Sequence, residues 1–121
     1  MKLTCTVETP MEKDGDRWYL SLDIGLESFL IKQLHLKSSR PVIRVLDPLH
    51  GSILRVKVPF RYNRVMCKVS GDKTIQELVK GDKVHIHLKY CGWWNAGEYG
   101  GPAWKLLSLA HQESTGTGSG V

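Results

Sequence analysis

The sequence predicts an all-β protein, a small five-stranded barrel with one short helix between the third and fourth core strands. Most of the chain alternates apolar and polar residues, the period of two that is typical of half-buried strands. One stretch, 74–80, instead carries helix signals and ends in Gly-Asp directly before a strand-like run. A short helix in this place is a recurring feature of small five-stranded barrels.

Alternation predicts the strands one by one. A turn-like segment with Pro, Asp and Gly separates the first two runs, which favours a long hairpin. Pro59 cannot donate a hydrogen bond to a neighbouring strand, so it marks an edge or a bulge, and the set of inward residues changes register after it. The expected strands span residues 2–8, 17–24, 42–46, 53–60, 62–69, 83–90 and 103–110.

Two segments break the alternation. Thr74 fits an N-cap, Glu77 completes a capping box, and Gly81 fits the residue that ends a helix. The stretch 26–41 fits neither the helical period nor the strand period cleanly. It is therefore expected to form either a short helix or an irregular strand.

Length and charge restrict the class of protein. A chain of 121 residues suits one domain and can bury a core without disulfides or a structural metal. We assign residues 1–111 to this domain and expect the small polar residues 112–121 to form a flexible tail. The formal net charge of +5 indicates an anionic partner such as nucleic acid.

The cysteines and the N-terminal residues indicate the compartment. Cys5, Cys67 and Cys91 are odd in number and form no C-x-x-C pair. We expect Cys5 and Cys67 to be buried, reduced thiols, which places the protein in a reducing intracellular compartment, cytoplasm or nucleus. The first residues lack the apolar core of a signal peptide, and no run is long enough to span a membrane, so no membrane partner is expected.

Cationic and aromatic side chains are expected on one face of the sheet. Residues at alternate positions of a strand share a face, so the polar positions of 83–90 form a row. The alternative interpretation is that this row is the solvent-exposed side of an antiparallel strand, which is ordinarily polar. If 53–69 joins the same sheet, however, cationic side chains that can bind phosphates lie beside flat side chains that can stack on bases. Binding of single-stranded nucleic acid requires this combination. The candidate nucleic-acid-binding residues of these segments are Arg55, Lys57, Arg61, Tyr62, Arg64, Lys68, Lys83, His85, His87 and Lys89.

Residues 91–102, CGWWNAGEYGGP, are predicted to form a flexible, glycine-rich loop. Trp93 and Trp94 are neighbours, so on an extended backbone they point to opposite sides. One should cap the core and the other, with Tyr99, should face solvent as a stacking platform for bases. We favour Trp94 as the platform because it lies nearer the centre of the segment.

The sequence gives no sign of a cofactor, a metal or an enzyme. His85 and His87 could chelate zinc, but Cys91 falls in the other register and no fourth ligand is apparent. The chain has no phosphate-binding glycine loop and no nucleophile motif, and its aspartates are scattered. We therefore expect a binding protein without catalytic residues.

The segment TIQELVKGDKVHIHLKY followed by WKLLSL resembles the helix, fourth strand and fifth strand of OB-fold single-stranded DNA-binding proteins. The resemblance covers residues 17–110 and rests on the order of the elements. It implies a barrel whose fourth-to-fifth strand connection lines the binding cleft. Members often carry an acidic C-terminal tail that recruits partner proteins. The last residues here contain a single acid, Glu113, so recruitment by such a tail is not expected.

These observations predict a binding protein for single-stranded nucleic acid of low sequence specificity, with DNA ahead of RNA. Such a protein would act in replication, recombination or repair, as a single chain, as a homodimer or with a protein of those pathways. A protein-interaction adaptor with the aromatic segment as its hot spot is the alternative from another class. An RNA-binding module is the third reading.

Overall fold

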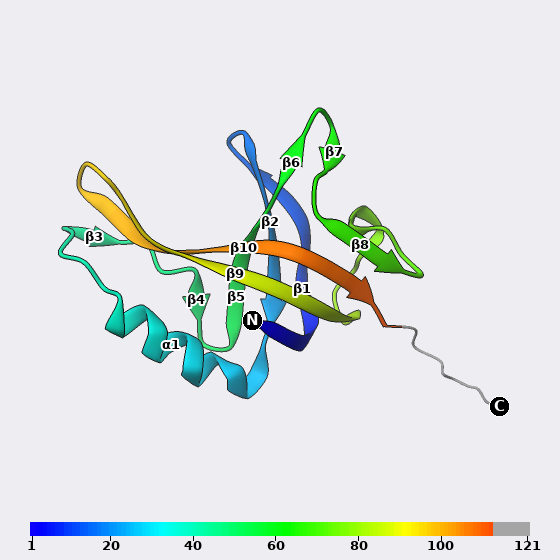
Figure 1. Ribbon diagram of the computed structural model, residues 1–121, viewed down its shortest axis with the longest axis horizontal. Helices are drawn as coiled ribbons and strands as arrows, with labels where there is room; N and C mark the ends of the chain where they lie inside the picture. The colour runs from blue at the N-terminus through cyan, green and yellow to red at the C-terminus, as the bar shows by residue number, and fades with distance from the viewer. Residues whose placement is uncertain (113–121) are drawn as a thin grey trace.

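A computed structural model describes residues 1–112 of the protein. Most of the expected tail lies outside this range. The prediction of a mostly β protein is confirmed (Figure 1). The elements in chain order are β1 (Lys2–Asp14), β2 (Arg17–Asp23), a 3-10 turn (Gly25–Glu27), α1 (Ser28–Lys37), β3 (Arg44–Val45), β4 (Leu49–His50), β5 (Ile53–Val58), β6 (Phe60–Arg61), β7 (Arg64–Val65), β8 (Lys68–Gly71), a second 3-10 turn (Ile75–Glu77), β9 (Lys83–Ala96) and β10 (Tyr99–His111).

Five strands pair in a ring that gives a barrel-like sheet. β1 pairs antiparallel with both β2 and β9, β2 pairs antiparallel with β5, and β9 pairs antiparallel with β10. The ring continues between β5 and β10 through the parallel pair Lys57 and Lys105. The spatial order β9-β1-β2-β5 is that of a Greek key, since the fourth long strand returns to lie beside the first.

The core lies inside this ring, and the alternation predicted for the long strands is confirmed. Alternate residues are buried over 3–7, 20–22, 54–58, 84–88 and 104–106, while the residues between them lie on the outer face. The buried residues on the ring strands are Leu3, Cys5, Val7, Leu20, Leu22, Leu54, Val56, Val58, Val84, Ile86, Leu88, Trp104, Leu106 and Leu109.

The second edge of β10 collects three segments that are distant in the sequence. β3, β5 and β8 each pair with it in parallel orientation. β8 therefore lies in the same sheet as β9, which was the condition for a shared basic face. Pro59 follows the last residue of β5, and beyond it β6 and β7 form a separate two-stranded hairpin that projects from the ring (Figure 1).

The undecided stretch 26–41 contains the longest helix, α1. Its inner face buries Ile31 and His35 against the barrel, but its outer face is also largely apolar. A helix that is apolar on both faces has no single apolar stripe, which explains why neither period fitted the sequence.

The predicted helix at 74–80 is wrong in extent. The capping box is present, and the Thr74 N–H donates to the Glu77 carboxylate at 2.9 Å. The turn covers only Ile75–Glu77, because the backbone becomes extended at Leu78 (φ −62°, ψ 139°). This change puts both Ile75 and Leu78 into the core and leaves Val79 exposed.

The cysteines follow the prediction in part. All three are free thiols, and Cys5 is buried, whereas Cys67 is only half-buried and Cys91 is exposed. Burial, with the carboxylate of Asp23 nearby, raises the pKa of Cys5 to about 12, so this thiol is inert at neutral pH. In the part of the chain that the structure describes, no helix has the length and apolar character needed to cross a bilayer.

A buried polar cluster fastens α1 to the barrel. The Trp104 indole Nε1 on β10 donates to His35 Nε2 at 2.8 Å. His35 Nδ1 lies 3.2 Å from a carboxylate oxygen of Asp47. Since Nε2 accepts a hydrogen bond from the indole N–H, His35 must be neutral in this arrangement.

The cluster predicts a pH dependence of stability. Burial lowers the pKa of His35 below its usual 6.5, and the Asp47 carboxylate opposes only part of that shift. The unfolded chain then binds this proton more readily than the folded one. Stability from this group is complete above about pH 6.5 and is lost as the pH falls, by at most about 1.4 kcal/mol for each pH unit.

Thermal melts of the natural protein and of His35→Gln, taken between about pH 7.5 and 5, check this prediction. The amide can still accept from Trp104 but does not titrate in this range, so the melting temperature of the variant should change less. Glu77 and Asp82 do not interfere, because their pKa values lie below the usual 4.5 and 3.8. Equal slopes for the two proteins would contradict the role of His35.

Candidate nucleic-acid interface

A groove of about 390 Å³ lies on the outer face where β8, β10, β9 and β1 run side by side. Both buried residues of these strands and their outward neighbours line it. The polar side chains that line it are Lys2, Thr4, Lys68, Ser70, His85, His87 and Ser108.

One row of side chains crosses the groove from edge to edge. Lys68 pairs with Ser108, Ser108 with His87, and His87 with Lys2, so the four residues stand abreast on four strands. Three strand spacings of about 4.8 Å separate the two lysines, roughly 14 Å in all. A single phosphate cannot bridge that width, whereas a chain of phosphates can.

The groove has the chemistry of an anion site. Its polar side chains are lysines, histidines and hydroxyls, and none of its lining residues carries a carboxylate. Thr4 Oγ1 lies 2.9 Å from His85 Nδ1, a hydrogen bond that holds the ring against β1. The Nε2 atom of His85 takes no part in this bond and is the atom left to meet a ligand.

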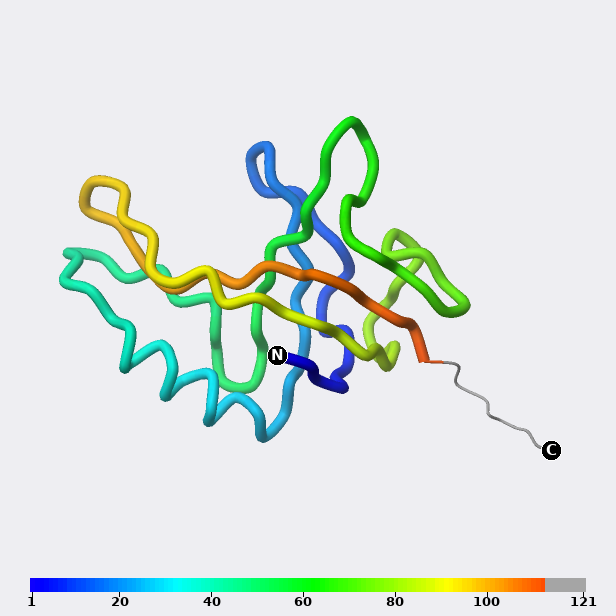
Figure 2. Tube along the Cα trace, in the orientation of Figure 1, coloured from blue at the N-terminus to red at the C-terminus, as the bar shows by residue number. Residues whose placement is uncertain are grey.

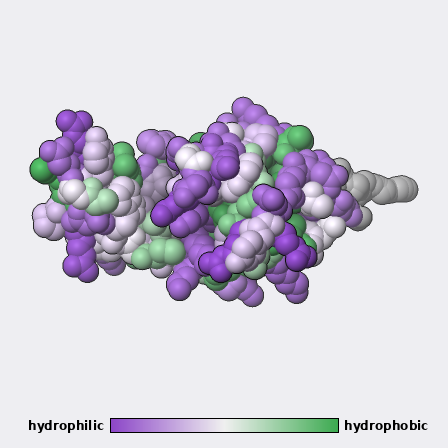
Figure 3. Space-filling view, turned by 90° about the horizontal axis from the view of Figure 1, so that it is seen from above, coloured by the Kyte–Doolittle hydropathy of each residue, from purple (hydrophilic) through white to green (hydrophobic). Residues whose placement is uncertain are grey.

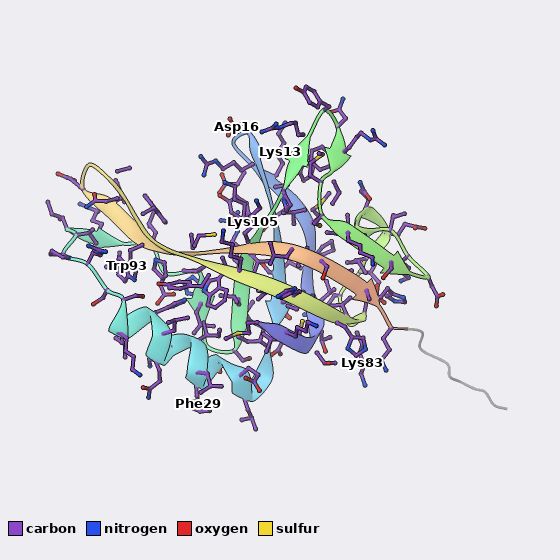
Figure 4. The ribbon with its side chains drawn as sticks, viewed as in Figure 1. Lys13, Asp16, Phe29, Lys83, Trp93 and Lys105 are labelled. Carbon is purple, nitrogen blue, oxygen red and sulfur yellow. The ribbon has the colours of Figure 1, made fainter. Side chains whose placement is uncertain are left out.

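A second basic row lies next to the groove. Lys57 on β5 pairs with Lys105 on β10, and Lys105 pairs with Lys89 on β9. Like charges placed directly opposite one another destabilise a sheet, so this row does not serve stability. Together the cationic and histidine residues of the two rows, His85 and Lys83 form the basic face, which consists of Lys2, Lys57, Lys68, Lys83, His85, His87, Lys89 and Lys105. Within residues 1–112, none of these eight makes an ion pair; Lys83 and Lys105 are labelled in Figure 4.

Arg55, expected in this site, is neutralised instead. Its guanidinium lies 3.2 Å from the Asp14 carboxylate and 4.0 Å from that of Glu12. It also stacks 3.9 Å above the ring of Tyr19. Acidic partners from the β1–β2 hairpin thus occupy the arginine that the sequence assigned to phosphate binding.

The β6–β7 hairpin carries three other expected residues away from the basic face. Arg61 and Arg64 are paired across it, and Tyr62 at its tip is 84% exposed. Tyr62 and Asn63 have positive φ values of 54° and 59°, which gives a tight two-residue turn. A tyrosine in this conformation destabilises the folded state by about 1 kcal/mol or more. The fold thus exposes the Tyr62 ring although its backbone is strained.

Figure 3 looks down on the side of the molecule from which this hairpin projects. The surface there is mostly hydrophilic, and hydrophobic side chains form only small separate patches. Neither Arg61 nor Arg64 has an ion-pair partner among the described residues. Within residues 1–112, the hairpin therefore offers two guanidinium groups without ion-pair partners and one exposed aromatic ring.

The prediction of a flexible aromatic loop at 91–102 is wrong. β9 and β10 continue as an antiparallel hairpin through this segment, with register pairs from Trp94 and Gly101 out to Ala96 and Tyr99. Gly92 (φ 82°) lies at a bulge beside Cys91, and Gly97 (φ 64°) makes the turn. These two glycines serve backbone geometry and not mobility.

The other two glycines admit a neighbouring segment. Residues 42–46 run beside the hairpin, with Arg44 and Val45 paired to β10 (Figure 2). A Cβ atom on Gly100 would come within 2.7 Å of the Val42 side chain, and one on Gly101 would overlap the carbonyl of Leu46. The segment can lie this close only because both positions lack a side chain.

The aromatic residues are present but lie apart from the groove. Trp93 is half-buried and its indole N–H has no partner within residues 1–112, whereas Trp94 is 38% exposed and Tyr99 43%. Trp94 is seven residues beyond His87 on β9, about 23 Å along an extended strand. Figure 4 shows Trp93 and Lys83 toward opposite ends of this strand. The hairpin is therefore not a clamp beside the basic groove.

Sequence reasoning missed Lys2 and Lys105 as members of the basic face. Both are exposed, on strands that the sequence predicts at 2–8 and 103–110. Only the pairing of β1 and β10 with β9 shows that they join the same face as His87 and Lys89.

Comparison with known proteins identifies no relative: no family model, no curated protein and no solved structure matches the sequence. Among residues 1–112, no three His, Cys, Asp or Glu side chains gather so that they could hold a metal ion. The chemistry of the candidate site is therefore that of its lysines, histidines, hydroxyls and exposed rings.

The close approach at Gly101 predicts a measurable cost. Gly101→Ala should reduce the free energy of unfolding by about 1–3 kcal/mol, because the new methyl group forces 42–46 away from β10. The matched control Ala103→Gly removes a methyl from the same strand and should cost less. Chemical denaturation measures both, and an unchanged Gly101→Ala protein would show that the segment is not docked.

Proposed function

We propose that this protein binds single-stranded nucleic acid, DNA in the first place and RNA in the second, with little preference for sequence. The observation that supports the proposal most strongly is the basic face, eight cationic or titratable side chains on adjoining strands with no ion-pair partner among the described residues. Contacts of this kind to phosphates are strong and independent of sequence.

The proposal includes the fold class. The OB fold is a five-stranded, partly open Greek-key barrel, and the ring of β1, β2, β5, β10 and β9 has that strand number and order. Two features depart from the resemblance noted in the sequence. The longest helix, α1, follows the second ring strand, and only a 3-10 turn precedes β9. On the β2–β5 face, the surface that OB folds use, Arg55 is already paired with acids.

A single strand suits this surface better than a duplex. The basic face is built from strands, and α1 presents an apolar outer face, so the described residues offer no basic helix for a major groove. Lys2, Lys68 and Lys105 would hold phosphates, while Tyr62 offers a flat ring beyond the groove for a base. Replication, recombination and repair are the settings in which such strands are exposed.

A protein-interaction role has one observation in its favour. Trp94 and Tyr99 are exposed on the distal hairpin, and the Arg44 guanidinium lies 6.0 Å from the Tyr99 ring. Tryptophan, tyrosine and arginine are the residues most enriched in protein hot spots. This site is remote from the basic face, so variants of the two regions separate the two functions.

The basic face is tested by a salt titration. Replacing Lys68 and Lys105 together with Ala should weaken binding of a labelled dT oligomer and reduce the slope of log affinity against log salt by about 0.7 for each lost phosphate contact. The double variant Lys13→Ala and Lys32→Ala removes the same charge outside the basic face. Its slope should stay near that of the natural protein.

Three results decide the matter. Equal loss of slope in both double variants would mean that net charge alone attracts the oligomer. An unchanged slope for Lys68→Ala with Lys105→Ala would remove the basic face from the binding site. Loss of binding after Trp94→Ala, with the lysine variants unaffected, would favour the distal hairpin as the site of interaction.

A further inference from the structure

A threonine and a histidine of the groove form a hydrogen-bonded pair across two strands. Thr4 on β1 stands directly opposite His85 on β9, and its Oγ1 atom lies 2.9 Å from His85 Nδ1. Both residues are exposed, and both line the groove of about 390 Å³. The hydrogen bond engages one ring nitrogen of His85 and leaves the other, Nε2, for a second partner.

The hydroxyl group of Thr4 can hold the histidine ring in either charge state. When the ring is neutral, the hydroxyl can donate to Nδ1, and the ring hydrogen then lies on Nε2. When the ring is protonated, Nδ1–H donates to the same oxygen, because a hydroxyl group both donates and accepts. His35 is the contrasting case, since the Trp104 indole can only donate and therefore fits only the neutral ring.

The surroundings of His85 suit an anion. Its direct neighbours on β1 and β10, Thr4 and Ala110, carry no charge. No lining residue of the groove carries a carboxylate. The charged and titratable side chains that line the groove around His85, or precede it in the outer row of β9, are Lys2, Lys68, His87 and Lys83. Lysines ordinarily keep their charge across the range in which a histidine titrates, so they add no pH dependence there.

His87 is less suited to gain a charge. Lys2 stands directly opposite it, and like charges directly opposite one another destabilise a sheet. The carboxylate of Asp82, which precedes β9, is bound by Lys73 at 2.8 Å. A positive charge in this part of the groove therefore has an anionic ligand as its fitting partner, and His85 is the residue that can supply the charge.

We propose that His85 binds a phosphate of the nucleic-acid strand most tightly when its ring is protonated, and that Thr4 positions the ring for this contact. The inference rests on the proposed function and adds a regulation by pH. Histidine changes its charge between about pH 5 and 8, and a hydrogen bond from a charged donor is roughly twice as strong as one from a neutral donor. Because a bound phosphate favours the protonated ring, binding takes up a proton, and the affinity rises as the pH falls.

Titration of a labelled dT oligomer at about pH 8 and about pH 6 tests the inference, because thymine does not titrate in this range. The natural protein should bind about threefold to fivefold more tightly at the lower pH. The slope of its log affinity against log salt should also be steeper there, by up to about 0.7. His85→Gln keeps a hydrogen-bond donor but takes up no proton, so it should bind equally at both pH values. The matched control His50→Gln removes an exposed histidine outside the groove and should keep the natural response.

A second pair of variants tests the positioning role of Thr4. Thr4→Val has nearly the size of threonine but no hydroxyl group, so the difference in affinity between the two pH values should fall below about twofold. Thr4→Ser returns the hydroxyl group and should return the response. A merely structural role would change stability without changing the ratio of the two affinities. Circular dichroism at both pH values checks that each variant is folded.

The outcomes separate this inference from the proposed function. Equal affinity of the natural protein at both pH values, with a salt slope that still depends on Lys68 and Lys105, would overturn the inference alone. A response lost in His87→Gln but kept in His85→Gln would contradict the assignment to His85, and one lost in His50→Gln as well would make net charge its cause. A full response in Thr4→Val would remove the role of Thr4. A natural protein that binds no oligomer at either pH would overturn both proposals.

Discussion

The arrangement of the whole molecule depends on the hydrogen bonding of β10. One edge of this strand pairs with β9 over nearly its full length, and the other receives β3, β5 and β8 in parallel. These parallel contacts join segments that are far apart in the chain, so each depends on the others being in place. Because β10 lies between β8 and β9, it also decides which cations become neighbours. Lys68 meets His87 only across Ser108, and Lys57 meets Lys89 only across Lys105.

Local sequence was a good guide where one physical rule decided the outcome. Alternation marks which face of a long strand is buried, and the inward positions predicted for 2–8, 17–24, 53–60 and 83–90 are buried or half-buried in the structure. It failed where tertiary contacts decide. The glycines of 91–102 were interpreted as flexibility, but Gly100 and Gly101 exist to admit residues 42–46, a segment that local sequence does not place there. The stretch holding α1 has apolar residues on both faces, so no period could be assigned.

The sequence predicts which types of residue form the candidate site, but not which individual residues belong to it. The outward positions of β9 and the cation Lys68 were named correctly as neighbours once a shared sheet was assumed. Lys2 and Lys105 were missed because their place depends on which strands pair, and a single sequence does not show pairing. Arg55 was assigned to phosphate because its acidic partners come from a hairpin about forty positions earlier, a distance that no local pattern spans. Tyr62 was named for its chemistry, but its strained backbone and projecting turn are properties of the fold.

The claim on which the account rests is that β10 assembles the basic face, and that this face is where a nucleic-acid strand lies. The most direct measurement is a titration of isotopically labelled protein with a dT oligomer, followed by amide chemical-shift changes residue by residue. The account predicts that the largest changes fall on residues 2–4, 68–70, 85–89 and 105–110, which the pairing of β9 with β1 and of β10 with β8 and β9 brings together, and that 93–99 change little. Changes confined to 93–99, or spread evenly over all charged segments, would contradict it.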